Sequence, residues 1–246
     1  MSDRQDMHVR KYDISPHNAH YSGAYSHSAL EWRRLGAVDK TNNLQSLLGG
    51  RDVSDVLEVG CGTGAVLAEV MRRGIGQRHI GIDVADPHEH VDQKAADLDL
   101  RSYDGHRLPF DDNSFDLVYA SHVLEHVPDP RGFLTELARV CSKYLYVEVP
   151  CEMTLRSRPV AIQTALKIGH INAYTPDYFM VLLQSAGLDV IDLKVFDHSL
   201  DVHSFGTSRW KGRMVQTIRQ SLLQVSPSVA AKIFCYHSGA LIDCSK

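Results

Sequence analysis

The feature that most constrains this chain is the segment 56–64, whose sequence is VLEVGCGTG. Its apolar half is typical of a buried strand, and its second half holds three glycines spaced two residues apart. Glycine accepts left-handed backbone dihedrals and leaves room for a ligand beside the main chain. A helical pattern follows and stops near Gly74, with four apolar residues on one face: Val66, Leu67, Val70 and Met71. We therefore predict a strand, a ligand-binding turn and a helix whose free N–H groups point at the ligand.

The spacing of the glycines distinguishes two kinds of cofactor turn. A dinucleotide turn has the pattern G-x-G-x-x-G, which fits a pyrophosphate against the helix N-terminus. Here the pattern from Glu58 to Gly64 is E-x-G-x-G-x-G, so the third glycine comes one residue early. This pattern resembles motif I of the class I S-adenosylmethionine-dependent methyltransferases, whose loop holds the amino-acid end of the cofactor. A glycine-rich turn by itself also fits a tight strand-to-helix connection that binds no ligand, so the residues downstream have to distinguish the two interpretations.

A second short strand is predicted at 79–84, with the sequence HIGIDV. A carboxylate at the end of the second strand of such a sheet can accept hydrogen bonds from both ribose hydroxyls. Asp83 is therefore the predicted ribose ligand, with Val84 beside it. The spacing from Gly60 fits a nicotinamide or an adenosylmethionine enzyme, so this residue predicts a nucleoside without choosing between them. The alternative is an aspartate that caps a loop.

The most specific block is 104–127, DGHRLPFDDNSFDLVYASHVLEHV. Residues 115–120 are nearly all apolar, as in a central parallel strand. The pattern D-x-x-x-LPF-x-DNSFDLV followed by HVLEHV resembles a subgroup of class I methyltransferases. That subgroup includes ubiquinone and menaquinone methyltransferases and many enzymes that act on natural products and sugars. The likeness extends over about residues 50–195, and GHINAYTP at 169–176 also resembles the family.

The resemblance implies the cofactor S-adenosyl-L-methionine and a set of residues that bind it. Asp104 would accept the exocyclic amine of adenine, and the backbone near Gly105 and His106 would complete adenine recognition. Residues just past the fourth strand would lie under the methionine and the sulfonium. The full set of expected cofactor-binding residues is Glu58, Gly60, Cys61, Gly62, Gly64, Asp83, Val84, Asp104, Gly105, His106, Ala120 and Ser121.

The implied fold class is α/β, a Rossmann-like methyltransferase sheet of seven strands with helices on both faces and an N-terminal helical cap. The sheet would be mostly parallel, with an antiparallel last strand near 233–242. We expect an N-terminal arm and cap helices over 1–50, with two helical patterns in 28–48, and the methyltransferase domain over 51–246. The whole chain would form one globular unit.

Further elements follow from local signals. Asp129 before Pro130, and Thr175 before Pro176, are typical of helix N-caps followed by a first helical residue. Strands are predicted at 144–150 and 188–196, and helices around 209–223 and after Ser226. The segment 151–173 is predicted to form part of a lid. Glu148 and Glu152 would lie near the substrate mouth, with salt bridging as the alternative.

Methyl transfer to an oxygen benefits from a general base, for which histidine is the usual choice. The candidates are His122, directly after the fourth strand, His126 and His170; each could instead shape the cofactor site or cap the backbone. We therefore expect a methyltransferase (EC 2.1.1) that acts on a small-molecule or sugar acceptor, with oxygen slightly favoured. The alternatives are an N- or C-methyltransferase and a catalytically silent adenosylmethionine-binding protein with a regulatory role. A nicotinamide dehydrogenase is a distant third.

Composition narrows the partners. The formal net charge of −4 with scattered basic residues gives no footprint for DNA. Five cysteines without a C-x-x-C pair favour a reducing, cytoplasmic setting, and no spacing of residues predicts a metal site. No secretion signal and no membrane-spanning apolar stretch is recognised. The oligomeric state cannot be read from the sequence.

Overall fold

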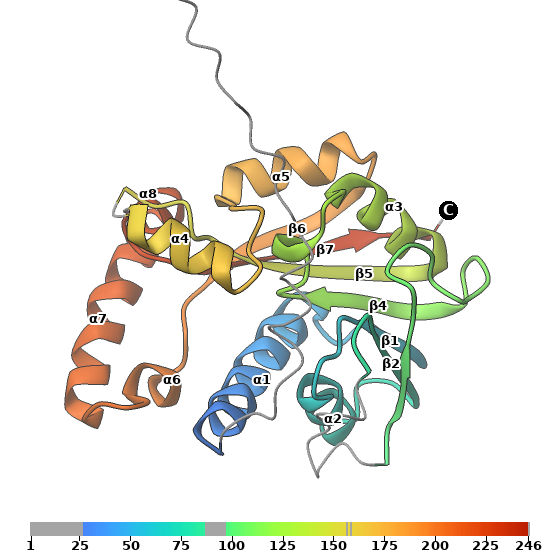
Figure 1. Ribbon diagram of the computed structural model, residues 1–246, viewed down its shortest axis with the longest axis horizontal. Helices are drawn as coiled ribbons and strands as arrows, with labels where there is room; N and C mark the ends of the chain where they lie inside the picture. The colour runs from blue at the N-terminus through green and yellow to red at the C-terminus, as the bar shows by residue number, and fades with distance from the viewer. Residues whose placement is uncertain (1–26, 87–96, 156, 158, 246) are drawn as a thin grey trace, which may run out of the picture.

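A seven-stranded sheet forms the middle of the molecule in the computed structural model, which describes residues 27–86, 97–155, 157 and 159–245 (Figure 1). The strand order is β3-β2-β1-β4-β5-β7-β6. The strands are β1 (Asp55–Val59), β2 (Arg78–Asp83), β3 (Asp99–Ser102), β4 (Phe115–Ser121), β5 (Cys141–Pro150), β6 (Asp189–Phe196) and β7 (His237–Asp243).

Strand direction positions the functional edge of this sheet. Strands β1 to β5 run parallel, and β7 pairs antiparallel with both β5 and β6. The strand order reverses between β1 and β4, and ligands of open α/β sheets bind at the carboxyl ends of the strands beside such a reversal. The predicted fold, with its antiparallel last strand, is confirmed.

Helices cover both faces of the sheet, as Figure 1 shows. On one face α1 and α2 pack against the sheet, and on the other α3 and α5 do so. The helices are α1 (His27–Leu48), α2 (Ala65–Arg72), α3 (Pro130–Val140), α4 (Pro159–Lys167), α5 (Pro176–Ser185), α6 (Leu200–Ser204), α7 (Arg209–Val225) and α8 (Pro227–Ile233), with a 3₁₀ turn η4 (Leu124–His126) after β4.

The alternation of side chains along each strand builds the two core layers. In β1, Val56 joins the cluster that includes Leu44 and Leu67, whereas Leu57 joins the cluster that includes Leu134 and Phe179. All six side chains are at most 1% exposed. Because neighbouring residues of a strand point to opposite faces, a strand with two covered faces has to be apolar throughout.

Local capping signals define the helix starts. The Asp129 carboxylate accepts a hydrogen bond from the Gly132 N–H at 3.0 Å, and the Thr175 hydroxyl accepts one from the Tyr178 N–H at 3.1 Å. Each leaves a proline at the first helical position, where its missing N–H is not needed. Both predicted N-caps are confirmed.

Several expectations from the sequence were wrong in detail. Residues 28–48 lie in one continuous helix, α1, because the break expected between the two patterns contains no proline and no glycine. Met71 is 43% exposed and does not share the buried face of α2. Ile233 ends α8, so the last strand begins later, at His237, and α6 was not anticipated. The part of the expected N-terminal arm that precedes residue 27 lies outside the described residues.

Within the described parts of the chain, no helix combines the length and the apolar character needed to span a bilayer.

Candidate active site

The glycine-rich turn after β1 has three glycines with left-handed φ angles, +79° at Gly60, +51° at Gly62 and +73° at Gly64. The N–H groups of Gly60 and Cys61 donate to the carbonyl of Ile82 at 2.7 and 3.1 Å, which fastens the turn to β2. Other residue types are strained at such φ values, so the backbone conformation of the turn requires glycine at these three positions.

The space around Gly60 differs from the space around Gly62. A Cβ added to Gly60 would lie 2.3 Å from Cγ2 of Val123, so this glycine allows the turn to pack against the loop after β4. A Cβ added to Gly62 would meet no described atom nearer than Nη1 of Arg33, at 3.9 Å. Gly62 therefore borders the space in which a ligand can lie against the main chain, beneath a guanidinium from α1.

Asp83 connects the turn to the end of β2. Its Oδ2 accepts a hydrogen bond from the Gly62 N–H at 2.8 Å, and its Oδ1 accepts one from the Ala85 N–H at 3.0 Å. Each carboxylate oxygen can accept more than one hydrogen bond, so the carboxylate is held in place with acceptor capacity remaining. The structure thus brings together the acidic residue and the glycine turn, which the sequence placed 21 residues apart.

Glu58 lies beneath the turn and is 2% exposed. Burial raises the pKa of its carboxyl to about 8, against the opposing charge of Lys40. Its Oε2 has no hydrogen-bond partner among the described residues. A cationic ligand group in this space would meet a carboxyl that lacks a full set of partners.

The side chain of Lys40 reaches the site from α1. Its Nζ lies 3.5 Å from the carbonyl oxygen of Ser121, close to the buried carboxyls of Glu58, Glu125 and Glu148. Burial lowers the pKa of Lys40 although these carboxyls act in the opposite direction. Helix α1 therefore supplies two cationic side chains, Arg33 and Lys40, to a site whose other charged groups are mostly acidic.

The residues expected around adenine lie at the exposed edge of the site. Asp104, Gly105 and His106 are exposed, and Asp104 Oδ1 accepts hydrogen bonds from the N–H groups of His106 and Arg107 at 2.8 and 3.1 Å. A Cβ on Gly105 would lie 3.1 Å from Cγ1 of Val84, so these two residues are neighbours. The predicted contacts with adenine stay predictions.

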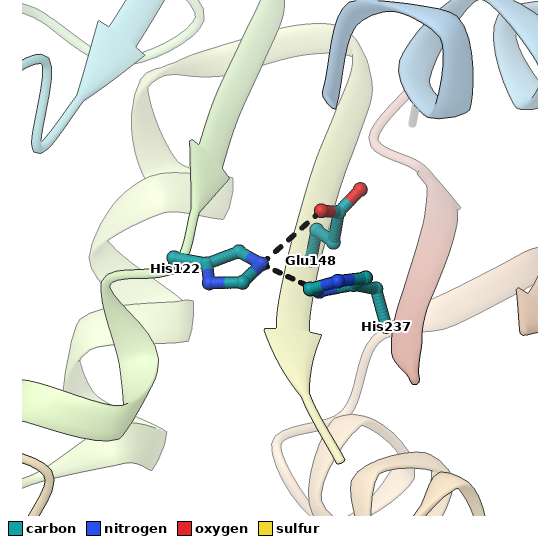
Figure 2. Close-up of side chains that lie close together, drawn as sticks. All are labelled: His122, Glu148 and His237. Atoms are coloured by element: carbon teal, nitrogen blue, oxygen red, sulfur yellow. Dashed lines mark hydrogen bonds and ion pairs between the residues drawn. The ribbon is translucent and has the colours of Figure 1, made fainter. Parts of the chain in front are cut away.

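His122 occupies the carboxyl end of β4 in a left-handed conformation, with φ +60°. Its backbone N–H donates to the Glu148 carbonyl at 2.9 Å, and its Nε2 lies 3.3 Å from Glu148 Oε1 and 2.9 Å from His237 Nδ1 (Figure 2). Burial holds the pKa of His122 well below its usual range, so the imidazole is neutral. The residues before it, Ala120 and Ser121, are buried in β4 and carry it to this edge.

His126 and His170 form a separate pair. Their rings meet edge to face with centroids 4.8 Å apart. Nδ1 of His126 lies 3.0 Å from the Gly169 carbonyl, and Nδ1 of His170 lies 2.7 Å from Glu152 Oε2. Burial lowers the pKa of His170, but the hydrogen bond to Glu152 and the charges of Glu125 and Glu152 together outweigh it, so the pKa is raised overall. The structure thus places one ring nitrogen of each histidine against a neighbouring oxygen of the protein.

Other residues of the site were not assigned a role from the sequence. Glu148 was expected near this mouth, but His237 carried no local signal, because it is 115 residues from His122. Only the register of the antiparallel pair, Pro150 opposite His237, brings it to the end of β5. Glu125 was part of the HVLEHV stretch, yet nothing in the pattern showed that its carboxyl would be buried.

The comparisons with known proteins agree with this geometry. A family model described as a methyltransferase domain matches residues 57–144. A ubiquinone biosynthesis O-methyltransferase from a Ruegeria species is 29% identical over 161 residues, 57% of this chain and 62% of that protein. Cycloartenol-C-24-methyltransferase 1 from Oryza sativa subsp. japonica is 30% identical over 150 residues, 56% of this chain and 44% of that protein. The chain therefore matches less than two thirds of the length of these curated relatives.

Solved structures show the same fold. A SAM dependent methyltransferase from Archaeoglobus fulgidus superposes with a TM-score of 0.58 at 20% identity, covering 86% of this chain and 94% of that one. At this identity the likeness concerns the fold. Together with the match of the methyltransferase-domain model to residues 57–144, this likeness supports a class I S-adenosylmethionine-dependent methyltransferase.

Proposed function

We propose that this protein transfers a methyl group from S-adenosylmethionine to an oxygen of a small-molecule or sugar acceptor. The observation that carries the choice of oxygen is the neutral imidazole of His122, which is fixed at the carboxyl end of β4. The next residue, Val123, packs against Gly60 of the cofactor turn, so His122 lies beside the place where the cofactor would be held. The ubiquinone biosynthesis O-methyltransferases among the relatives support a hydroxyl acceptor.

The residues present fit the cofactor. Asp83 offers ribose hydroxyls a carboxylate that two backbone N–H groups already hold in place. The space beside Gly62 suits the amino-acid end, where Arg33 would bind the carboxylate and the incompletely partnered Glu58 would favour a positive charge. Val84 and Gly105 would flank the adenine. When bound, S-adenosylmethionine supplies an electrophilic methyl group on a sulfonium.

The residues of this chain would then orient the acceptor and activate it. His122 would act on the acceptor hydroxyl, since an alcohol attacks slowly without such help. The surrounding buried side chains keep water away from the reacting atoms. We assign His126 and His170 to shaping the acceptor pocket, because they form a pair of their own that the Gly169 carbonyl and the Glu152 carboxylate hold in place.

The first test is calorimetric titration with S-adenosylmethionine and S-adenosylhomocysteine. We expect micromolar binding that Asp83→Ala weakens at least about tenfold, since losing hydrogen bonds to a carboxylate costs roughly 1.5–3 kcal/mol. The matched control is Asp99→Ala, which removes an exposed carboxylate from the neighbouring strand β3. No binding by the folded wild type would refute the proposal.

The second test follows methyl transfer by mass shift on hydroxylated aromatic and sugar acceptors. With an accepted substrate, His122→Ala should lower kcat about a hundredfold while the affinity for S-adenosylmethionine stays unchanged. Loss of less than about threefold would remove His122 from the reaction. A protein that binds the cofactor but methylates none of these acceptors would contradict the proposed transfer and favour a silent binding protein.

A further inference from the structure

Three side chains from three strands converge at the carboxyl edge of the sheet, as Figure 2 shows. His122 follows β4, Glu148 lies in β5, and His237 begins β7. One donor atom from each side chain lies within 4.8 Å of the other two. His122 Nε2 is 2.9 Å from His237 Nδ1 and 3.3 Å from Glu148 Oε1. We call these three residues the His–Glu–His cluster.

We propose that the His–Glu–His cluster binds a divalent transition-metal ion, with zinc as the best match, and leaves one coordination position open. Two imidazoles and one carboxylate are the protein ligands of open catalytic zinc sites. Tetrahedral bonds of about 2.0–2.1 Å place neighbouring donor atoms about 3.3 Å apart. The cluster already has separations of 2.9 and 3.3 Å, so only a small expansion would admit the ion.

Each ligand also has an outer partner that orients it. Glu148 Oε2 accepts hydrogen bonds from the Tyr146 hydroxyl and from Asn43 Nδ2, which turns Oε1 toward His122. On His237, the nitrogen that would not bind the ion, Nε2, lies 3.0 Å from His198 Nε2. Metal-binding histidines and carboxylates characteristically have such outer hydrogen-bond partners.

A buried carboxyl lies near the second ring nitrogen of His122. Its second nitrogen, Nδ1, lies 3.6 Å from Oε1 of Glu125. Glu125 is 1% exposed, and neither of its carboxyl oxygens has a hydrogen-bond partner among the described residues. This buried carboxyl would accept the Nδ1–H of His122 and so fix the tautomer whose Nε2 lone pair faces the ion.

The backbone and the charges support the same site. The left-handed φ of +60° at His122 is uncommon for histidine, and the hydrogen bond from its N–H to the Glu148 carbonyl holds it. Among the described residues, Lys40 is a cationic side chain that lies near the carboxyls of Glu125 and Glu148. One positive charge therefore faces two acidic groups at this site.

This inference rests on the proposed function and specifies how the acceptor oxygen would be activated. A bound divalent ion lowers the pKa of a hydroxyl that coordinates it and fixes the position of the oxygen. With the ion present, His122 would hold the metal through Nε2, so its contribution to activity would be ligation. The acceptor class would then be one whose hydroxyl, or pair of neighbouring oxygens, can bind a metal ion.

The test measures metal binding directly on the full chain. Protein freed of metal by dialysis against a chelator would be titrated calorimetrically with Zn²⁺, and its visible spectrum recorded with Co²⁺. We expect one ion per chain with micromolar or tighter affinity, and a cobalt spectrum typical of tetrahedral coordination. His237→Ala and Glu148→Gln should each weaken binding at least tenfold and remove that spectrum. Glu148→Gln retains an oxygen that can accept the hydrogen bonds from Tyr146 and Asn43. This variant therefore still tests metal binding if His237→Ala misfolds.

The matched control is His170→Ala. His170 belongs to a second group of nearby donors, with Glu125 and His126, and shares no ligand with the His–Glu–His cluster. Zinc binding lost in His170→Ala but kept in Glu148→Gln would overturn the proposal, as would a wild type that binds no ion. Titration of the same samples with S-adenosylmethionine separates the two proposals. Cofactor binding without metal binding refutes only this inference, whereas metal binding without cofactor binding refutes the proposed methyl transfer.

Discussion

Replacing Gly60 by alanine tests how the cofactor turn is joined to the loop that carries His122. Two effects add in this variant. The φ of +79° places an L residue in the left-handed region, which costs about 1–2 kcal/mol. The new methyl group would also lie 2.3 Å from Cγ2 of Val123, and forcing extra volume into packed structure costs about 1–3 kcal/mol. We expect a loss of about 2–5 kcal/mol in the free energy of unfolding.

Gly74 provides the matched control, because it separates the two effects. Its φ is +69°, yet a Cβ there would meet nothing within 4 Å. Gly74→Ala therefore carries the backbone strain without the clash, and both alanines restrict the unfolded chain equally. The difference between Gly60→Ala and Gly74→Ala, measured by urea denaturation, should be about 1–3 kcal/mol.

A double-mutant cycle then assigns the clash to Val123. Truncating Val123 to alanine removes both Cγ atoms and leaves its Cβ, which would lie 3.3 Å from the new methyl group. The double variant Gly60→Ala/Val123→Ala should therefore be more stable than the sum of the single changes predicts, by about 1 kcal/mol or more. Additive effects, or a Gly60→Ala variant no less stable than Gly74→Ala, would refute the packing account of this glycine.

Two further predictions concern buried or paired carboxyls and the dependence of stability on pH. Glu69 accepts hydrogen bonds from Arg72 and Arg73, and the bond from Arg72 is the main reason why the pKa of this carboxyl is lowered to about 2. The ionised carboxylate therefore stabilises the fold above about pH 4.5, and this contribution is lost as the pH falls toward 2. Because Arg72 is largely exposed, Glu69→Gln should lower the free energy of unfolding in urea by only about 1 kcal/mol at pH 7. A loss of stability that is equally large at pH 3 would contradict this account. Burial raises the pKa of Glu58 to about 8, so ionising this carboxyl costs stability as the pH rises from about 4.5 through 8. Glu58→Gln should therefore gain roughly 4 kcal/mol in stability relative to wild type between pH 5 and pH 8.5. It should also bind S-adenosylmethionine more weakly. A stability difference that does not change with pH would show that Glu58 does not titrate in this range.

The acidic residues of the site share one cationic neighbour, so the ionisation of each carboxyl depends on the same lysine. Glu58, Glu125 and Glu148 are all nearly fully buried, and burial raises the pKa of Glu58 to about 8 and that of Glu125 to about 7. Lys40 lies close to all three carboxyls, and its charge opposes the rise in the pKa of Glu58 and of Glu125. The site is therefore poised to receive positive charge, which both a sulfonium cofactor and a divalent cation would bring.

What the sequence determined by itself was local. The apolar run before the glycines predicted β1, the acidic end of the next strand placed Asp83, and the Asp-Pro and Thr-Pro pairs located the starts of α3 and α5. These features could be read because strand patterns, helix caps and glycine dihedrals depend on residues a few positions apart. The resemblance to the methyltransferases added the seven-stranded, mostly parallel sheet and its antiparallel last strand.

What only the tertiary structure decided was which distant residues meet. The contact of Gly60 with Val123, the approach of Arg33 and Lys40 from α1, and the meeting of His122 with His237 all depend on helix packing and strand register. A register shift of one residue in β7 would turn His237 to the other face of the sheet, and no local pattern fixes that register. The glycine turn could therefore be predicted from the sequence, whereas the His–Glu–His cluster beside it could not.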